Sequence, residues 1–246
     1  MTKRKLEDLN LLDDFLFNSV VNYPGSDTDK HVARLDVYIE ETCTGNSEND
    51  IKVYDIEPDK NINDANILPK RVRFYHAKID AHCLKSGESY QMLKKVMVIL
   101  ITPYDPFNPE RMIYTIRNKC EEVPSMPYDD GACTIFLYTK GTKGTPPEEL
   151  RQLLHYMEHT TEENAKNDNL QNIQKMVDTV KQDKGVSLEY MKISEREEML
   201  SQQGLQQGLQ QGRLEEQVNT ERERQRADPL EEELRRLKEQ LHQQSS

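Results

Sequence analysis

The sequence lacks any long apolar run. Its most apolar segment, KVMVILIT at residues 95–102, is eight residues long and is followed by Pro103. A helix needs about 20 consecutive apolar residues to cross a bilayer, so this segment predicts a buried strand and no membrane span. Apolar residues make up 35% of the chain and charged residues 31%, which is a low apolar share for a fully packed globule.

The shortage of apolar residues is uneven along the chain. All five phenylalanines lie in the first 160 residues, whereas the last fifty are mostly Gln, Glu and Arg with scattered Leu. We therefore expect a packed core at residues 1–160, a helical extension at 161–200, and a tail at 201–246.

Cysteine is scarce, and net charge is strongly negative. The four cysteines show neither a C-x-x-C pair nor a zinc spacing, and the chain begins without a signal-like segment. These features predict reduced thiols and a cytoplasmic protein. A net charge of −11 argues against general coating of nucleic acid, although it permits a local basic groove.

Two predicted strands, residues 34–39 and 51–60, carry acidic residues in an apolar frame. Both are rich in β-branched and aromatic residues, and turn formers separate them. Side chains alternate along a strand, so Glu57 and Asp59 can face the same way, and pairing of the strands can bring Asp36 next to Glu57. Carboxylates are ligands for Mg²⁺. The alternative is a hairpin whose acids face solvent.

A basic helix is predicted after the acidic strand, at residues 68–86, ending at Gly87. Cations beside an acidic metal site would hold a phosphodiester backbone, and the alternative is a solvated amphipathic helix. His76 and His82 are interpreted as packing or surface residues because no second ligand stands at a zinc spacing. Arg71, Lys78 and Lys85 recur every seven residues, so they are expected to share a face of the helix away from its apolar stripe. The candidate DNA-binding residues are Lys70, Arg71, Arg73, Lys78 and Lys85.

The remaining core pattern alternates helices and strands. Helices are expected at residues 9–21, from Pro146, and from 162 to 199 with a division at Gly185; further strands are expected at 112–117 and 134–139. This mixture of strands with flanking helices predicts an α/β fold.

The tail begins with a glycine repeat and ends with a leucine pattern. Glycines recur every four residues in QQGLQQGLQQGR, which predicts a frayed helix. Asp228 and Pro229 then predict the start of a new helix. Its leucines form a seam of about two heptads, which could support a homo-oligomer or have no role; they are Leu230, Leu234, Leu237 and Leu241.

The order of these segments resembles a known family. The strings are RLDVYIEE, VYDIEPDK, LPKRVRFYHAKIDAHCLKSGESY, VILITPYDPF, IYTIRNKCEE and TIFLYTKGT. From about Leu9 to about Met199 they are similar to the PD-(D/E)XK nuclease family transposases, the bacterial recombination-promoting nuclease type. The segment near residues 22–30 is shorter than is usual in that family.

The resemblance implies a restriction-endonuclease-like mixed sheet flanked by helices and a metal-dependent DNA endonuclease. Asp36 and Glu57 match its metal-binding acids and would hold Mg²⁺ or Mn²⁺. Asp59 stands where the family usually has Gln or Lys, and would complete the acidic cluster or position water. Lys60 could supply the missing positive charge. The alternatives are a catalytically silent DNA-binding or oligomerising remnant, and a structural protein assembled through the tail.

Overall fold

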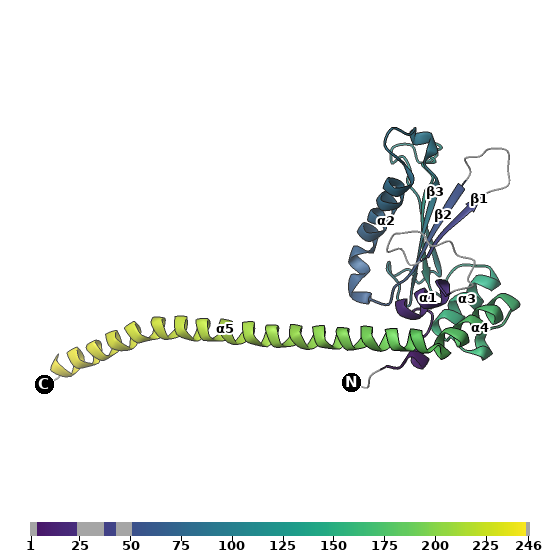
Figure 1. The fold of residues 1–246 in the computed structure, drawn as a ribbon. Coiled ribbons are helices and arrows are strands. Elements are labelled where there is room, and N and C mark those ends of the chain that lie inside the picture. The colour runs from purple at the N-terminus through teal and green to yellow at the C-terminus, as the bar shows by residue number, and fades with distance from the viewer. Residues whose placement is uncertain (1–3, 24–36, 43–50, 245–246) are drawn as a thin grey trace. The chain divides into compact units, whose positions relative to one another are not determined.

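The computed structural model describes residues 4–23, 37–42 and 51–244 (Figure 1). Asp36 and most of the shortened segment near residues 22–30 therefore lie outside the described residues. The chain forms two compact units, Met1–Leu188 and Glu189–Ser246. None of the described helices is long and apolar enough to cross a membrane.

The first unit is built on a five-stranded mixed sheet. The strands are β1 (Val37–Thr42), β2 (Ile51–Pro58), β3 (Lys95–Thr102), β4 (Ile113–Ile116) and β5 (Ala132–Tyr138), in the order β1-β2-β3-β5-β4. The three central strands are parallel, and the edge strands β1 and β4 are antiparallel to their neighbours. The α/β prediction is confirmed, including the pairing of the two acid-bearing segments and the central position of the apolar strand β3.

Helices flank this sheet. They are α1 (Asp14–Val21), α2 (Leu68–Cys83), α3 (Glu148–Glu158) and α4 (Asp168–Gln182). Figure 1 shows α2 running alongside the sheet, with α1, α3 and α4 gathered near one end of it. Apolar side chains of α2 and the sheet form a core cluster that includes Val53, Leu68, Val72, Ile79, Val98, Leu100 and Phe136.

Helices α1 and α4 pack together in a second buried region. Leu12, Leu16 and Val177 are fully or almost fully buried there. The Lys181 ammonium donates to the carbonyl oxygens of Glu7 and Leu9 at 3.0 and 2.8 Å, which ties the N-terminal segment to α4. Burial lowers the pKa of Lys181, while nearby acids, Asp178 first among them, act in the opposite direction.

Three predicted helix boundaries are wrong. The helix expected from residue 162 begins at Asp168, because residues 162–164 form a short 3-10 helix and the Asn167 side chain accepts the Leu170 N–H at the start of α4. The first helix begins at Asp14, not at residue 9, because residues 9–13 form a turn in which the Asp13 carboxylate accepts the Asn10 N–H. Helix α2 ends at Cys83, three residues before the predicted end, because Leu84 is extended. Gly87 does adopt a φ of +90°, but it turns the chain after the helix has ended.

The second unit consists mainly of the helix α5. This helix runs from Lys184 to Gln244, so its first residues belong to the first unit. It continues through the glycine repeat and through Pro229, so the predicted new helix at Asp228 is wrong. A proline within a helix removes one backbone hydrogen bond, and the helix here continues past that gap. A Cβ atom added at Gly204, Gly208 or Gly212 would meet nothing within 4 Å, so no described residue packs closely against these glycines.

Candidate active site beneath helix α2

A row of three acids lies on the face of β2 that α2 covers. Asp55, Glu57 and Asp59 alternate along the strand and its end, and their exposed fractions are 0, 4 and 6%. Val53, two residues earlier on the same face, belongs to the core beneath α2. The predicted common orientation of Glu57 and Asp59 is therefore observed, in a buried setting and not in a solvent-facing hairpin.

Asp55 was missed as a site residue. It lies two residues before Glu57, so strand alternation alone places it on the same face. Its fully buried position between β1 and β3, opposite Tyr38 and Val98, required knowledge of which strands flank β2.

Arg71 of α2 reaches into this row. Its Nη2 atom lies 2.6 Å from Asp59 Oδ2 and 3.8 Å from Glu57 Oε2. Burial lowers the pKa of Arg71, but the neighbouring carboxylates, Asp59 foremost, raise it to a greater extent. Arg71 was predicted to share an outer DNA-binding face with Lys78 and Lys85; the structure instead turns its guanidinium inward, between two acids.

Tyr75 lies one helical turn after Arg71 and contacts Glu57, one of the two acids that Arg71 approaches. Burial raises the pKa of its hydroxyl, and a hydrogen bond to the Glu57 carboxylate raises it further. The Arg71 guanidinium carbon lies 5.8 Å from the centre of the Tyr75 ring, within the range of a cation–π contact. Tyr75 therefore positions both the glutamate and the arginine.

Two buried donors beside the row have no partner among the described residues. They are the Tyr104 hydroxyl, in a side chain that is 7% exposed, and the Arg71 Nε–H. Burial raises the pKa of Tyr104, and the Asp59 carboxylate adds to this effect. Buried polar groups are nearly always hydrogen-bonded, so an additional acceptor such as a ligand oxygen would satisfy these two donors.

Lys60 points away from the acids, as strand alternation indicates. Its ammonium lies 2.8 Å from Asp13 Oδ2 and 2.7 Å from Asn10 Oδ1, near the start of α1. Arg4 binds the same Asp13 carboxylate. The positive charge next to Glu57 and Asp59 is therefore supplied by Arg71 and not by Lys60.

The described acids can place one cation between two carboxylates, but not among three. Alternate residues on a strand are about 6.6 Å apart, so one ion cannot touch Asp55, Glu57 and Asp59 together. In agreement, no group of three or more His, Cys, Asp or Glu able to hold a metal occurs among the described residues. The contacts of Arg71 show that one cation does fit beside both Glu57 and Asp59. Mg²⁺ usually takes only one or two carboxylates and keeps several waters.

The other predicted DNA-binding cations lie outside the acid row. Lys70 and Arg73 are exposed on α2, Lys78 is half-buried, and Lys85 follows the end of the helix. None of the four forms an ion pair with a described residue.

His76 lies on the side of α2 that is turned towards β5. Its Nε2 atom lies 3.0 Å from Thr134 Oγ1, and its Nδ1 atom is buried without a partner among the described residues. Burial lowers the pKa of His76, whereas Asp80 and Asp130 act in the opposite direction. These contacts agree with the interpretation of His76 as a packing residue.

Acidification is expected to destabilise the protein through His76. In the unfolded chain this histidine gains a proton near pH 6.5, but in the folded protein it resists protonation. Stability that is present above pH 6.5 is therefore lost as the pH falls towards the lower folded pKa. Urea denaturation at pH 7.5 and 5.5 measures the loss, which should be smaller in His76→Gln.

The stability contributed by Asp80 depends on pH in the opposite direction to that contributed by His76. Burial raises its pKa above 3.8, so its contribution is present at low pH and lost as the pH rises through its folded pKa. An equal loss between pH 7.5 and 5.5 in the wild type and in His76→Gln would contradict the assignment to His76.

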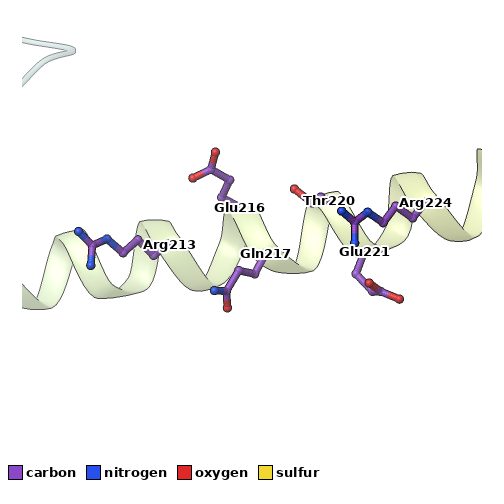
Figure 2. A pocket seen from close by; sticks show the side chains of 6 residues that line it. All are labelled: Arg213, Glu216, Gln217, Thr220, Glu221 and Arg224. Carbon is purple, nitrogen blue, oxygen red and sulfur yellow. The ribbon is translucent and has the colours of Figure 1, made fainter.

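A hollow on the surface of α5 lies outside the acid row. Figure 2 shows six polar side chains around it, all from successive turns of the one helix: Arg213, Glu216, Gln217, Thr220, Glu221 and Arg224. All six are exposed. Because no second element supplies a wall, this hollow lacks the burial that a catalytic site requires.

Comparison with known proteins adds no further constraint on the site. No family model, no curated protein and no solved structure matches this chain.

Proposed function

We propose that the protein is a metal-dependent DNA endonuclease of the recombination-promoting nuclease type, with a restriction-endonuclease-like sheet. The supporting observation is that Glu57 and Asp59, two buried acids on one strand face, share the Arg71 guanidinium, at 3.8 Å from Glu57 and 2.6 Å from Asp59. Burial of an ionised carboxylate is costly unless it is paired and hydrogen-bonded. The place of these two acids at the end of β2, next to unpartnered donors, favours a chemical role.

In this proposal Glu57, together with Asp36 from the segment before β1, holds Mg²⁺ or Mn²⁺. The ion would supply an activated water and offset charge on the scissile phosphate. Tyr75 orients the Glu57 carboxylate through its hydroxyl. Asp59 anchors Arg71, whose guanidinium stays charged at any working pH and can hold a phosphate oxygen next to Glu57.

The cations of α2 complete the proposed substrate site. Lys70, Arg73 and Lys78 have no ion-pair partner among the described residues, so their charge is available to a polyanion. Contacts of this kind position a nucleic-acid backbone without reading its sequence. Lys85 would extend the same contact beyond the helix.

Cleavage of supercoiled plasmid tests the proposal. The wild type should nick the plasmid with Mg²⁺ or Mn²⁺ and lose this activity in EDTA. Glu57→Gln removes the proposed ligand and should abolish nicking. The exposed Glu121, far along the sequence in the loop before β5, provides the matched control variant Glu121→Gln, which should nick as the wild type does.

A catalytically silent DNA-binding or oligomerising remnant is the second candidate, and one observation favours it. The Arg71 guanidinium lies in the space between Glu57 and Asp59 that a metal ion would use. Thermal unfolding with and without Mn²⁺ separates the two candidates, because an ion that binds the folded state raises the melting temperature. A working site predicts a rise that Asp36→Asn abolishes. A folded wild type with neither rise nor nicking would establish the remnant.

A further inference from the structure

Phe74 is exposed in the middle of the basic helix. Its side chain is 63% exposed, whereas the other four phenylalanines, all within the described residues, are buried or half-buried. A large apolar ring on the surface of a stable helix costs hydration free energy without adding to the core. Its surroundings therefore decide whether it has a binding role.

The surroundings of Phe74 are cationic. Residues four apart on a helix are neighbours, so Lys70 and Lys78 flank the ring on either side along the helix, and Arg73 is adjacent in sequence. Besides Arg71, which is paired with acids, helix α2 carries three Lys or Arg residues and one acidic residue, Asp80, within a chain of net charge −11. The surface next to Phe74 is therefore cationic although the chain as a whole is acidic.

The ring lies on the flank of α2 that carries Arg71, and it is exposed whereas the acids are buried. Each residue turns a helix by about 100°, so Phe74 is about 60° from Arg71 around the axis. Arg71 points to Asp59 and Glu57, whereas His76, on the opposite flank of the helix, reaches Thr134 of β5. A strand of nucleic acid lying along Phe74 would therefore pass next to Arg71, which contacts the acids.

We propose that this side of α2 binds single-stranded nucleic acid, with Phe74 stacked on an unpaired base and Lys70, Arg73 and Lys78 at the phosphates. Aromatic rings interleaved with cations are suited to unpaired bases, because each base presents a face to stack and each nucleotide a phosphate to hold. Paired bases are already stacked within the duplex and are not available. The proposal rests on the proposed nuclease function only in naming unpaired DNA as the substrate class.

The absence of tryptophan from the chain permits a direct test of stacking. Phe74→Trp introduces the only tryptophan, whose fluorescence can be excited selectively in the presence of the eleven tyrosines. The variant is titrated with unlabelled oligo(dT) in EDTA at low salt, so that no cleavage takes place. Stacking should quench the fluorescence in a saturable manner. Tyr90→Trp is the matched control, because Tyr90 is 82% exposed but lies in the short 3-10 helix Tyr90–Met92, outside α2; its fluorescence should stay unchanged.

Binding of a labelled oligo(dT) gives the affinity. Removing one stacked base costs about 1–3 kcal/mol, so Phe74→Ala should weaken binding by about 5- to 150-fold. Phe74→Tyr, which retains a stacking ring, should bind within about threefold of the wild type. Unchanged affinity in Phe74→Ala, or oligonucleotide binding without quenching in Phe74→Trp, would overturn the proposal, as would no binding by the folded wild type.

The same experiment separates this inference from nuclease activity. Binding in EDTA with no plasmid nicking in Mg²⁺ or Mn²⁺ would refute the nuclease and leave the Phe74 site standing. Nicking without binding of oligo(dT) would refute the Phe74 site and leave the nuclease standing. If Phe74→Ala instead converts a dimer into a monomer in sedimentation, with no oligonucleotide bound, the exposed ring serves self-association and the proposal is wrong.

Discussion

Arg71→Gln is expected to destabilise the first unit by about 3–5 kcal/mol, because removal of one partner from a buried ion pair leaves the other charge uncompensated. The Asp59 and Glu57 side chains are almost fully buried, and the lost contacts are those at 2.6 and 3.8 Å. Glutamine retains a polar amide, but it is shorter than arginine and has no charge. Urea denaturation followed by circular dichroism gives the free energy of unfolding.

Two companion variants test whether the loss of stability in Arg71→Gln comes from the uncompensated charge of the acids. Arg73→Gln removes an exposed arginine with no described ion pair and should change the free energy of unfolding by less than about 0.5 kcal/mol. Adding Asp59→Asn to Arg71→Gln removes the stranded acid as well, so the double variant should regain part of the lost stability. A double variant less stable than Arg71→Gln would show that Asp59 has a stabilising role of its own.

The loss in Arg71→Gln should depend on pH. Without the guanidinium, the charge of the two buried carboxylates has no counter-charge, and burying an unpaired charge is costly. Acidification diminishes that charge, so the difference between the wild type and Arg71→Gln should be smaller at pH 5 than at pH 8. An equal difference at both values would contradict this expectation.

Strand alternation and apolar periodicity were sufficient to predict the elements that make the site. They located β2, β3 and α2, and they placed Glu57 and Asp59 on one face. They could not show whether that face meets solvent or a helix, because burial depends on Val72 and Ile79 of α2, which come later in the chain. For this reason Asp55 was missed.

Helical periodicity also grouped Arg71 with Lys78 correctly around the helix axis, at about 20° apart. It could not predict which of the two side chains turns inward. That depends on the acids beyond the end of β2, which give a long guanidinium side chain an ion pair to reach. In the tail, Pro229 is a favourable first residue of a helix and an unfavourable interior one, so local sequence favoured a new helix, whereas α5 continues through this position.

Gly141→Ala is the second substitution with a large expected effect. A Cβ atom at this position would lie 2.5 Å from both Cα and N of Met112 and 2.8 Å from the carbonyl carbon of Arg111. These are backbone atoms, so no side-chain rotation can relieve the clash. Residues 140–143 and 110–112 must separate, although backbone hydrogen bonds join them, including Met112 N–H to the Lys143 carbonyl at 3.1 Å.

The expected loss for Gly141→Ala is about 2–5 kcal/mol. Overpacking in a closely packed region costs about 1–3 kcal/mol, and each broken hydrogen bond adds about 1 kcal/mol. Gly208→Ala is the matched control, because its Cβ would meet nothing within 4 Å. Alanine there should leave the first unit unchanged and add helical signal from α5.

The position of Gly141 connects this loss to the proposed site. The segment that it contacts ends the loop after β3, in which Asp105 accepts hydrogen bonds from the Phe107 N–H and the Tyr114 hydroxyl. Tyr104, with its buried hydroxyl beside Asp59, begins the same loop. Displacement of residues 110–112 should therefore reduce metal-dependent nicking, even at temperatures where Gly141→Ala remains folded. Full nicking by a destabilised Gly141→Ala would show that Tyr104 and its loop do not contribute to the site.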